Sequence, residues 1–323
     1  MPLVTTQRVH FLAAVVTLAV AACSLASLFG RHQYLELTTH FRLQYALAAS
    51  ACLILLLALH SWKLAPLALA CAVLNWSFIV PYYFAGPRHA APSAGVRLRL
   101  MHANVLGGNR DYAALASVVE KERPDVLVLQ EFTGAWEEGL RGLEAQYPYS
   151  KLAPRQGGSG MALYSRHPLE GAEVLNLDPT SHLALFARVK VEGATLTVLA
   201  LHPPTPVRAD KFANRNLQFE RAASIMRETP GPKLLVGDLN VTMWSPYFAD
   251  LVRDSGLRNA RRGFALIPSW PVPLPTPLQI PIDHCLVSDD LAVDSIRTGA
   301  RTGSDHRPLI IDLRISSVQN PPR

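Results

Sequence analysis

Two short polar motifs stand directly beside apolar runs in the second half of the chain. Residues 237–240 read Gly-Asp-Leu-Asn after the apolar run 233–236, and residues 303–308 read Gly-Ser-Asp-His-Arg-Pro before the apolar run 309–313. Active sites collect at strand ends in layered α/β proteins, because the backbone there is rigid while the side chains face a crevice. The two motifs therefore indicate one site at the ends of buried strands.

Carboxylates, amides and two imidazoles follow or precede successive apolar runs, without a cysteine cluster. Such a set suits a hard cation that takes oxygen ligands, Mg²⁺ in the first place and Mn²⁺ as an alternative. Hydrolysis of a phosphodiester needs a cation on the phosphoryl oxygens, a group that orients or deprotonates water, and donors for the developing charge. The candidates for these parts are Asn104, Glu131, His202, Asp238, Asn240, Asp283, Asp305 and His306.

Strands and helices that can position these residues interleave from residue 96 onward. The expected strands are residues 96–103, 126–130, 160–164, 183–191, 195–201, 233–236, 282–287 and 309–313, and the expected helices are residues 111–122 and 209–227. Adjacent strands mixed with a few helices favour an α/β fold of two packed sheets flanked by helices over a repeated βαβ unit. The proline-rich segment 267–281 must be an extended loop.

The N-terminal part contains three uncharged apolar runs, residues 11–30, 45–62 and 64–85, each of a length that can cross a bilayer. A cleaved signal peptide is the alternative for the first run, but two further runs follow at once. Buried core helices are the alternative for all three, but short basic loops rarely join such runs in a soluble domain. We expect three transmembrane helices.

The domain organisation follows from these patterns. Residues 1–86 form a membrane anchor, and residues 87–95, rich in proline, glycine and small side chains, form a linker. Residues 96–315 form one catalytic domain, and residues 316–323 a tail.

The positive charge belongs mostly to the membrane part. Residues 1–94 hold five Lys and Arg and one Glu, whereas residues 95–323 hold twenty-six Lys and Arg and twenty-four Asp and Glu. The folded domain therefore lacks the strong basic excess that is typical of duplex-binding proteins.

The membrane side of the catalytic domain stays open from the sequence. The positive-inside rule favours the cytoplasm, whereas three spans with a cytoplasmic N-terminus place the domain in the periplasm of a bacterial inner membrane.

The strand-end motifs resemble those of the endonuclease/exonuclease/phosphatase superfamily, the hydrolases similar to deoxyribonuclease I. The resemblance covers residues 96–315 and implies a four-layer sandwich of two packed mixed sheets flanked by helices, here preceded by the membrane helices. The matching segments, in order, are residues 102–105 (His-Ala-Asn-Val), 129–131 (Leu-Gln-Glu), 160–166 (Gly-Met-Ala-Leu-Tyr-Ser-Arg), 201–203 (Leu-His-Pro), 237–240 (Gly-Asp-Leu-Asn), 282–284 (Ile-Asp-His) and 304–308 (Ser-Asp-His-Arg-Pro).

For the metal, the resemblance implies three residues. Glu131 would be the main metal carboxylate, Asn104 would help to hold the metal or the phosphate, and Asp305 would complete the metal environment. Many nuclease members carry an Asp two residues after this Asn, where the present chain has Leu106. The resemblance therefore does not supply a second metal ligand from this strand.

For the reaction, the resemblance implies five residues. Asp238 would orient or deprotonate the attacking water, and Asn240 would hold the scissile phosphate. His306, with its ring oriented by Asp283, would contact a phosphoryl oxygen or transfer a proton, and His202 would supply a second imidazole. A carboxylate behind a histidine fixes its tautomer and favours its charged form.

The remaining polar and aromatic residues receive no single role from the sequence. His102 is expected inside the core or behind the site, and His284 to face away from Asp283 because side chains alternate along a strand. Trp244 and Trp270 fit either packing or the edge of the site, and Arg215 is expected on a solvated helix face.

The sequence thus favours a membrane-anchored, Mg²⁺-dependent phosphoesterase that acts on a phosphodiester, either a phospholipid head group or a nucleic acid. The alternatives are a DNA or RNA endonuclease proper and, from another class, a catalytically inactive phosphate-binding membrane receptor or scaffold. The expected partners are the phosphate-ester substrate and the lipid bilayer, and no obligate protein partner is inferred.

Overall fold

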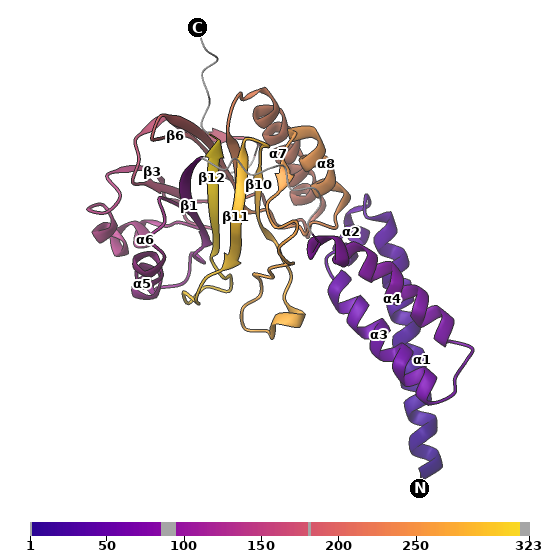
Figure 1. Cartoon of the computed structure of the whole chain (residues 1–323). Helices are drawn as coiled ribbons and strands as arrows, with labels where there is room; N and C mark the ends of the chain where they lie inside the picture. Colours follow the sequence, from indigo (N-terminus) through magenta and orange to yellow (C-terminus); the bar gives the residue numbers. More distant parts are fainter. Residues whose placement is uncertain (1, 85–94, 180–181, 317–323) are drawn as a thin grey trace.

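The structure is a computed structural model that describes residues 2–84, 95–179 and 182–316. Within these ranges a group of apolar helices extends from one side of a sandwich of sheets and helices (Figure 1). Nearly all of the expected linker at 87–95 and of the tail at 316–323 lies outside the described residues.

The strands of the described residues form two six-stranded sheets. The first sheet has the order β11 (Leu291–Thr298), β12 (Leu309–Ser316), β1 (Gly95–Asn104), β2 (Val126–Gln130), β4 (Met161–Ser165) and β3 (Tyr149–Ala153). The second sheet has the order β5 (Leu169–Asn176), β6 (Leu183–Val191), β7 (Ala194–Leu201), β8 (Lys233–Asp238), β10 (Asp283–Val287) and β9 (Arg258–Asn259). Each sheet has one parallel pair, β1 with β2 and β7 with β8, and is otherwise antiparallel, so both are mixed as expected.

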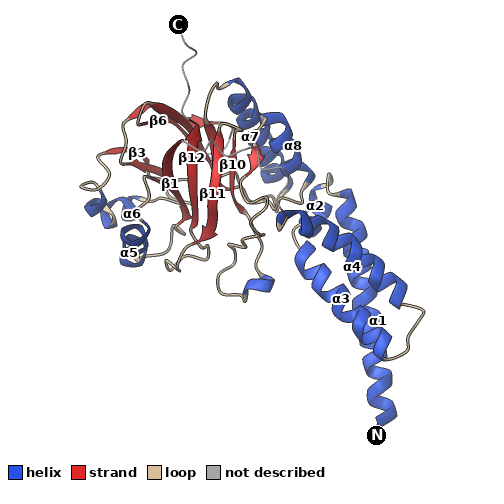
Figure 2. Cartoon of the chain, viewed as in Figure 1, coloured by secondary structure: helices blue, strands red, loops and turns tan. Residues whose placement is uncertain are grey.

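The two sheets pack face to face through apolar side chains. Leu100 and Val128 of the first sheet and Leu185 and Val198 of the second are fully buried in this core. The outer face of the first sheet is covered by α5 (Tyr112–Glu122) and α6 (Gly134–Gly139), and that of the second by α7 (Ala209–Glu228) and α8 (Pro246–Ser255) (Figure 2). This arrangement is the expected α/β sandwich with helices on both outer faces.

Central strands were predictable, whereas edge strands were not. The predictions for β2 and β6 match the observed bounds, because these strands are apolar over most of their length. The sequence did not indicate β5 and β11, which lie at sheet edges and carry outward charges such as Glu170 and Asp294. Charges on edge strands are typical, because they discourage pairing with another chain.

The N-terminal helices are α1 (Pro2–Ala26), η1 (Ser27–Phe29), α2 (Gln33–Thr39), α3 (Arg42–Ala58), α4 (Ala65–Ile79) and η2 (Val80–Tyr82). By length and composition, the described residues hold two helices that can cross a membrane, Gln7–Phe29 and Ala65–Tyr82. The expected run 45–62 falls on α3, which passes the same test only together with α2, to which it is bent by 61°. The described chain therefore offers two spans, or three if the bent pair is one span.

The N-terminal helices dock on the sandwich through a buried interface, which we call the junction. The Glu36 carboxylate of α2 lies 2.7 Å from the Arg215 guanidinium of α7, and both side chains are fully buried. Glu36 also accepts a hydrogen bond from the Ser245 hydroxyl. The expectation that Arg215 lies on a solvated helix face is therefore wrong, because its partner comes from a distant part of the sequence.

Further contacts at the junction involve the loop after β8. His40 Nδ1 lies 3.1 Å from Thr242 Oγ1, and Trp244 donates its indole N–H to the carbonyl of Phe78 at 3.1 Å. Trp244 is thus a packing residue of the junction. These contacts begin two residues after Asn240, so the helices hold the segment that follows one of the candidate site residues.

Candidate active site

Strand register brings the candidate residues to one end of both sheets. In the first sheet Asn104 pairs with Gln130 across parallel strands, so Glu131 emerges at the same edge. In the second sheet Asp238 lies opposite Asp283 across antiparallel strands. His202 directly follows β7, the parallel neighbour of β8, and therefore joins the same edge.

Asp238 is the centre of the assembled side chains. One carboxylate oxygen, Oδ2, lies 3.6 Å from Nε2 of His202 and 3.6 Å from Nε2 of His306, and it accepts the Asn104 amide at 3.2 Å. The other oxygen accepts the backbone N–H of Asn240 at 2.9 Å. Asp238 is buried, and a buried carboxylate requires such partners to stay charged.

The two histidines and Asp238 shift one another's pKa. Burial lowers the pKa of His306, but Asp283 and Asp238 outweigh burial and raise it to about 10. Burial also opposes charge on His202, yet Asp238 raises its pKa. In return, the two imidazoles hold the pKa of the Asp238 carboxyl below its ordinary value in spite of burial. At neutral pH His306 is therefore an imidazolium beside a carboxylate.

Asp283 fixes the orientation of the His306 ring. Nδ1 of His306 lies 2.9 Å from Oδ2 of Asp283, which turns Nε2 of the same ring toward Asp238. Asp283 is fully buried, and Arg261 donates to its backbone carbonyl at 2.6 Å. The other carboxylate oxygen lies 3.6 Å from Nδ1 of His102, a fully buried ring whose pKa is lowered by burial.

Glu131 presents a half-buried carboxylate at the end of β2. Its two oxygens accept hydrogen bonds at 3.0 Å from the Asn104 amide and from the Gly107 N–H. The residue has φ +59°, a left-handed conformation that is uncommon for a non-glycine residue and often marks a functional site. Gly158 lies beside it, where a Cβ would stand 3.7 Å from the carboxylate.

Glu131 has the donor chemistry that Mg²⁺ prefers, a half-buried carboxylate, since this ion commonly binds through one or two carboxylates and keeps several waters. The Asn104 side chain turns its NH₂ group toward Glu131 and Asp238, because its oxygen accepts the Leu106 N–H at 3.0 Å. Asp305 accepts the Trp270 indole N–H at 3.0 Å. Among the described residues, no group of three or more His, Cys, Asp and Glu side chains is arranged to hold a metal.

Asn240 is connected to the loop that follows His202. Its amide donates to the carbonyl of Pro203 at 3.0 Å, and its side-chain oxygen accepts the Thr205 hydroxyl at 3.2 Å. With φ +51° Asn240 turns the chain away from β8 toward the junction. The structure thus places Asn240 beside Asp238 through the backbone, with its side chain directed to residues 203–205.

Three residues that support the site received no role from the sequence. Gln130, fully buried, donates to the carbonyl of Leu201 at 2.9 Å and accepts the N–H of Asp238 at 2.8 Å, so it joins the two sheets. A glutamine inside an apolar strand was the available signal, because a buried amide must find partners. Ser304 donates its hydroxyl to the carbonyl of Asn104 at 2.8 Å and accepts the N–H of His306 at 3.1 Å, but neither it nor Arg261 gave such a signal.

Two undecided residues now have a place. Trp270 lies beside the site, with its ring centroid 6.4 Å from that of His306. His284 is fully buried on the opposite side of β10 from the site, where its ring nitrogens lie 2.8 Å from the carbonyl of Val241 and 3.0 Å from Arg261. The interpretation of His284 as a structural residue fits this position.

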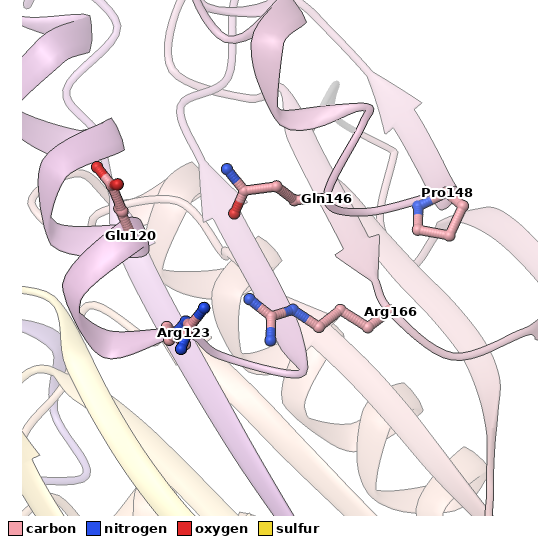
Figure 3. A pocket seen from close by; sticks show the side chains of 5 residues that line it. All are labelled: Glu120, Arg123, Gln146, Pro148 and Arg166. Atoms are coloured by element: carbon pink, nitrogen blue, oxygen red, sulfur yellow. The ribbon is translucent and has the colours of Figure 1, made fainter.

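A separate pocket of about 560 Å³ lies at the other end of the first sheet. Figure 3 shows the Arg166 side chain extending toward Arg123, with Glu120 and Gln146 nearby. Arg166 follows Ser165, which pairs with Val126 at the start of β2, whereas Glu131 follows the end of β2. The pocket and the candidate site therefore lie at opposite ends of this strand. The pocket contains none of the candidate residues, and we assign it no part in the site.

The fold and the site define an α/β sandwich with a cluster of paired carboxylates and imidazoles at one end of its two sheets. Residues 101–306 match the model of the Endonuclease/Exonuclease/phosphatase family, and the chain belongs to this family. The resemblance inferred from the strand-end motifs is therefore confirmed for the sandwich. The family's name covers nucleases and phosphatases, which are hydrolases of phosphate esters.

Solved structures share the fold at low sequence identity. The endonuclease/exonuclease/phosphatase from Beutenbergia cavernae has 21% identity and a TM-score of 0.56, covering 71% of this chain and 74% of its own. D. rerio TDP2, complexed with a single-strand DNA product, has 17% identity and a TM-score of 0.59, covering 68% and 99%. Sphingomyelinase C from Streptomyces griseocarneus has 18% identity and a TM-score of 0.51, covering 67% and 99%. No curated protein matches the sequence.

Proposed function

We propose that the chain is a membrane-anchored, Mg²⁺-dependent phosphoesterase that hydrolyses a phosphodiester by attack of water. The observation that carries this proposal is the position of Asp238 between the imidazoles of His202 and His306, with Asp283 behind the second ring. Two rings that favour their charged forms suit a phosphate anion, and the carboxylate between them suits a water molecule.

The proposed step forms a bond from the water oxygen to phosphorus and breaks the bond from phosphorus to the leaving alcohol. Asp238 orients the water and takes its proton, while His306 donates a proton to the leaving oxygen. Return of the proton from Asp238 to Nε2 of His306, 3.6 Å away, restores the starting state. The products are an alcohol and a phosphomonoester.

Glu131 would hold the divalent cation, and Asp305 is proposed to complete its surroundings together with water. Asn104, whose NH₂ group faces Glu131 and Asp238, is proposed to donate to the phosphate. The chemistry that Mg²⁺ supplies in such a site is neutralisation of charge on the phosphoryl oxygens. Asn240 and His202 are proposed to hold the remaining phosphoryl oxygens.

Chelation of divalent ions is expected to abolish turnover of bis(p-nitrophenyl) phosphate by the full-length protein in detergent, and Mg²⁺ or Mn²⁺ to restore it. Glu131→Gln removes one negative charge while keeping the size of the side chain. It is expected to raise the Mg²⁺ concentration for half-maximal rate by about tenfold or more. Activity that persists in chelator, or an unchanged Mg²⁺ requirement in the variant, would contradict the metal assignment.

The pH dependence of the rate is expected to report His306. A pKa raised to about 10 means that the His306 ring stays charged through neutral pH. The free energy of folding gained from its carboxylate partners is complete below about pH 6.5 and is lost as the pH rises through about 10. Asp283→Asn removes one of the two carboxylates that raise the pKa of His306. The alkaline limb of kcat/KM should therefore move to lower pH. A limb that does not move in this variant would remove Asp283 from its proposed role.

The phosphodiester is proposed to be a phospholipid head group or a nucleic acid. A DNA or RNA endonuclease proper would lose affinity steeply as salt rises, because phosphate neutralisation dominates such binding. The second alternative, an inactive receptor or scaffold, is disfavoured by the assembled carboxylates and imidazoles.

The location is proposed to be a bacterial inner membrane. The two or three candidate spans support membrane association, and a reporter fused to the C-terminus would decide on which side the catalytic domain lies.

A further inference from the structure

An uncharged loop stands between the candidate site and the N-terminal helices. Residues 263–282 contain no charged side chain, and we call the part 267–281 the proline loop. Its tip, residues 273–278, is exposed throughout, and Leu274 and Leu278 expose 42% and 51% of their surface. Uncharged, exposed apolar segments of this kind mark contacts with other molecules or with membranes.

The base of the proline loop is fixed to the residues beside His306. The Trp270 indole donates to the Asp305 carboxylate at 3.0 Å, and the Val272 N–H donates to the Asp305 carbonyl at 2.8 Å. The Ser269 carbonyl accepts the Arg307 N–H at 2.9 Å. The loop therefore leaves the sandwich at the candidate site itself.

The tip of the proline loop is fixed to α3. Gln44, in the first turn of α3, donates to the carbonyls of Pro277 and Gln279 at 2.9 Å and 3.3 Å. Figure 1 shows the loop beneath the strand ends and beside α3. Leu278 thus lies next to the N-terminal turn of α3, after which the helix is apolar.

The outward face of α3 continues the apolar surface of the tip. Leu47, one turn after Gln44, exposes 41% of its surface, and Ile54 exposes 69% further along the helix. In a bilayer these side chains would face lipid, which places Gln44 and the bound tip near the level of the head groups.

From this placement we infer that the tip of the proline loop rests on the bilayer through Leu274 and Leu278, and that the substrate is a phospholipid phosphodiester in that bilayer. The inference rests on the proposed phosphodiesterase function. Only three residues separate Trp270, which touches Asp305, from Leu274, so a head group bound at the surface lies within the reach of the site. Water would cleave the head-group ester and leave a phosphomonoester and an alcohol.

The test uses the full-length protein reconstituted in vesicles of phosphatidylethanolamine and phosphatidylglycerol, with release of soluble head-group product as the readout. The same preparations are assayed in detergent on the soluble bis(p-nitrophenyl) phosphate. Leu274→Ser combined with Leu278→Ser removes the apolar contacts of the tip and keeps the hydrogen bonds of its backbone. Tyr149→Ser is the matched control, because Tyr149 is 40% exposed on β3, at the sheet edge far from α3.

The double variant is expected to lose about tenfold or more of its rate on vesicles and less than about twofold on the soluble ester, because two apolar contacts with the bilayer are removed. The control is expected to keep both rates. An equal rate of wild type and double variant on vesicles would overturn the inference, as would an equal loss on both substrates. Wild-type turnover of the soluble ester without turnover of vesicles would also overturn it, leaving the phosphodiesterase proposal intact. No wild-type turnover of the soluble ester would instead contradict the proposed function.

Discussion

Asp238→Asn is expected to lower kcat on bis(p-nitrophenyl) phosphate by about a thousandfold, the usual scale for loss of a general acid or base. The carboxylate lies 3.6 Å from Nε2 of His202 and of His306, and no other carboxylate has this position in the described part of the chain. The amide of Asn cannot take a proton from water. Because Asn is uncharged, it also lowers the pKa of the His202 and His306 rings relative to the wild type.

The measurement is kcat of the full-length protein in detergent at saturating Mg²⁺, with thermal unfolding followed in parallel. Asp312→Asn is the matched control, because Asp312 is also paired with a cation, Arg99, at 2.6 Å but lies in the middle of β12, away from the site. The control is expected to keep its kcat. A folded Asp238→Asn protein with normal kcat would remove the basis of the proposed function.

Arg215→Met is expected to weaken the junction by about 3–5 kcal/mol, which corresponds to a hundredfold to several-thousandfold loss in the association of its two sides. Glu36 and Arg215 are both fully buried and 2.7 Å apart, so loss of the cation leaves a carboxylate without its partner in an apolar interface. The two partners come from α2 and α7, so the loss acts between the N-terminal helices and the sandwich.

A protease site placed within residues 87–95 makes this loss measurable. After cleavage, the wild-type sandwich should stay bound to the N-terminal helices through the junction, whereas the Arg215→Met sandwich should be released. Glu36→Leu combined with Arg215→Met should restore much of the retention, because both charges are then absent. Glu170→Gln, which breaks the exposed pair with Lys190, is the control and should have little effect. Release of the wild-type sandwich on cleavage would contradict a stable junction.

The junction also explains why the full chain is the right material for these experiments. Ile79 and Ala46 of the N-terminal helices share an apolar cluster with Phe248 of α8 and Leu239, the neighbour of Asp238. Removal of the helices would expose this surface and the buried Arg215. The segment after Asn240 would lose its contact with His40.

The sequence by itself determined the central strands and the residues at their ends. Runs such as residues 126–130 and 183–191 are apolar and buried over most of their length, so their bounds could be predicted. The order of polar motifs at the run ends was sufficient to identify the family, because a strand end places its following side chain at the sheet edge. Edge strands such as β5 and β11 lacked this apolar pattern.

Only the tertiary structure decided the relations across elements. The hydrogen bonds that make Gln130 a link between the two sheets depend on their packing, which no local pattern contains. The local sequence of its helix indicates a surface position for Arg215. The side chain can be buried because its charge is paired with that of Glu36, 179 residues earlier. The contact of the proline loop with Gln44 likewise joins residues 233 positions apart. Residue types near a strand end suffice to suggest chemistry, whereas burial and charge pairing depend on which distant segments meet.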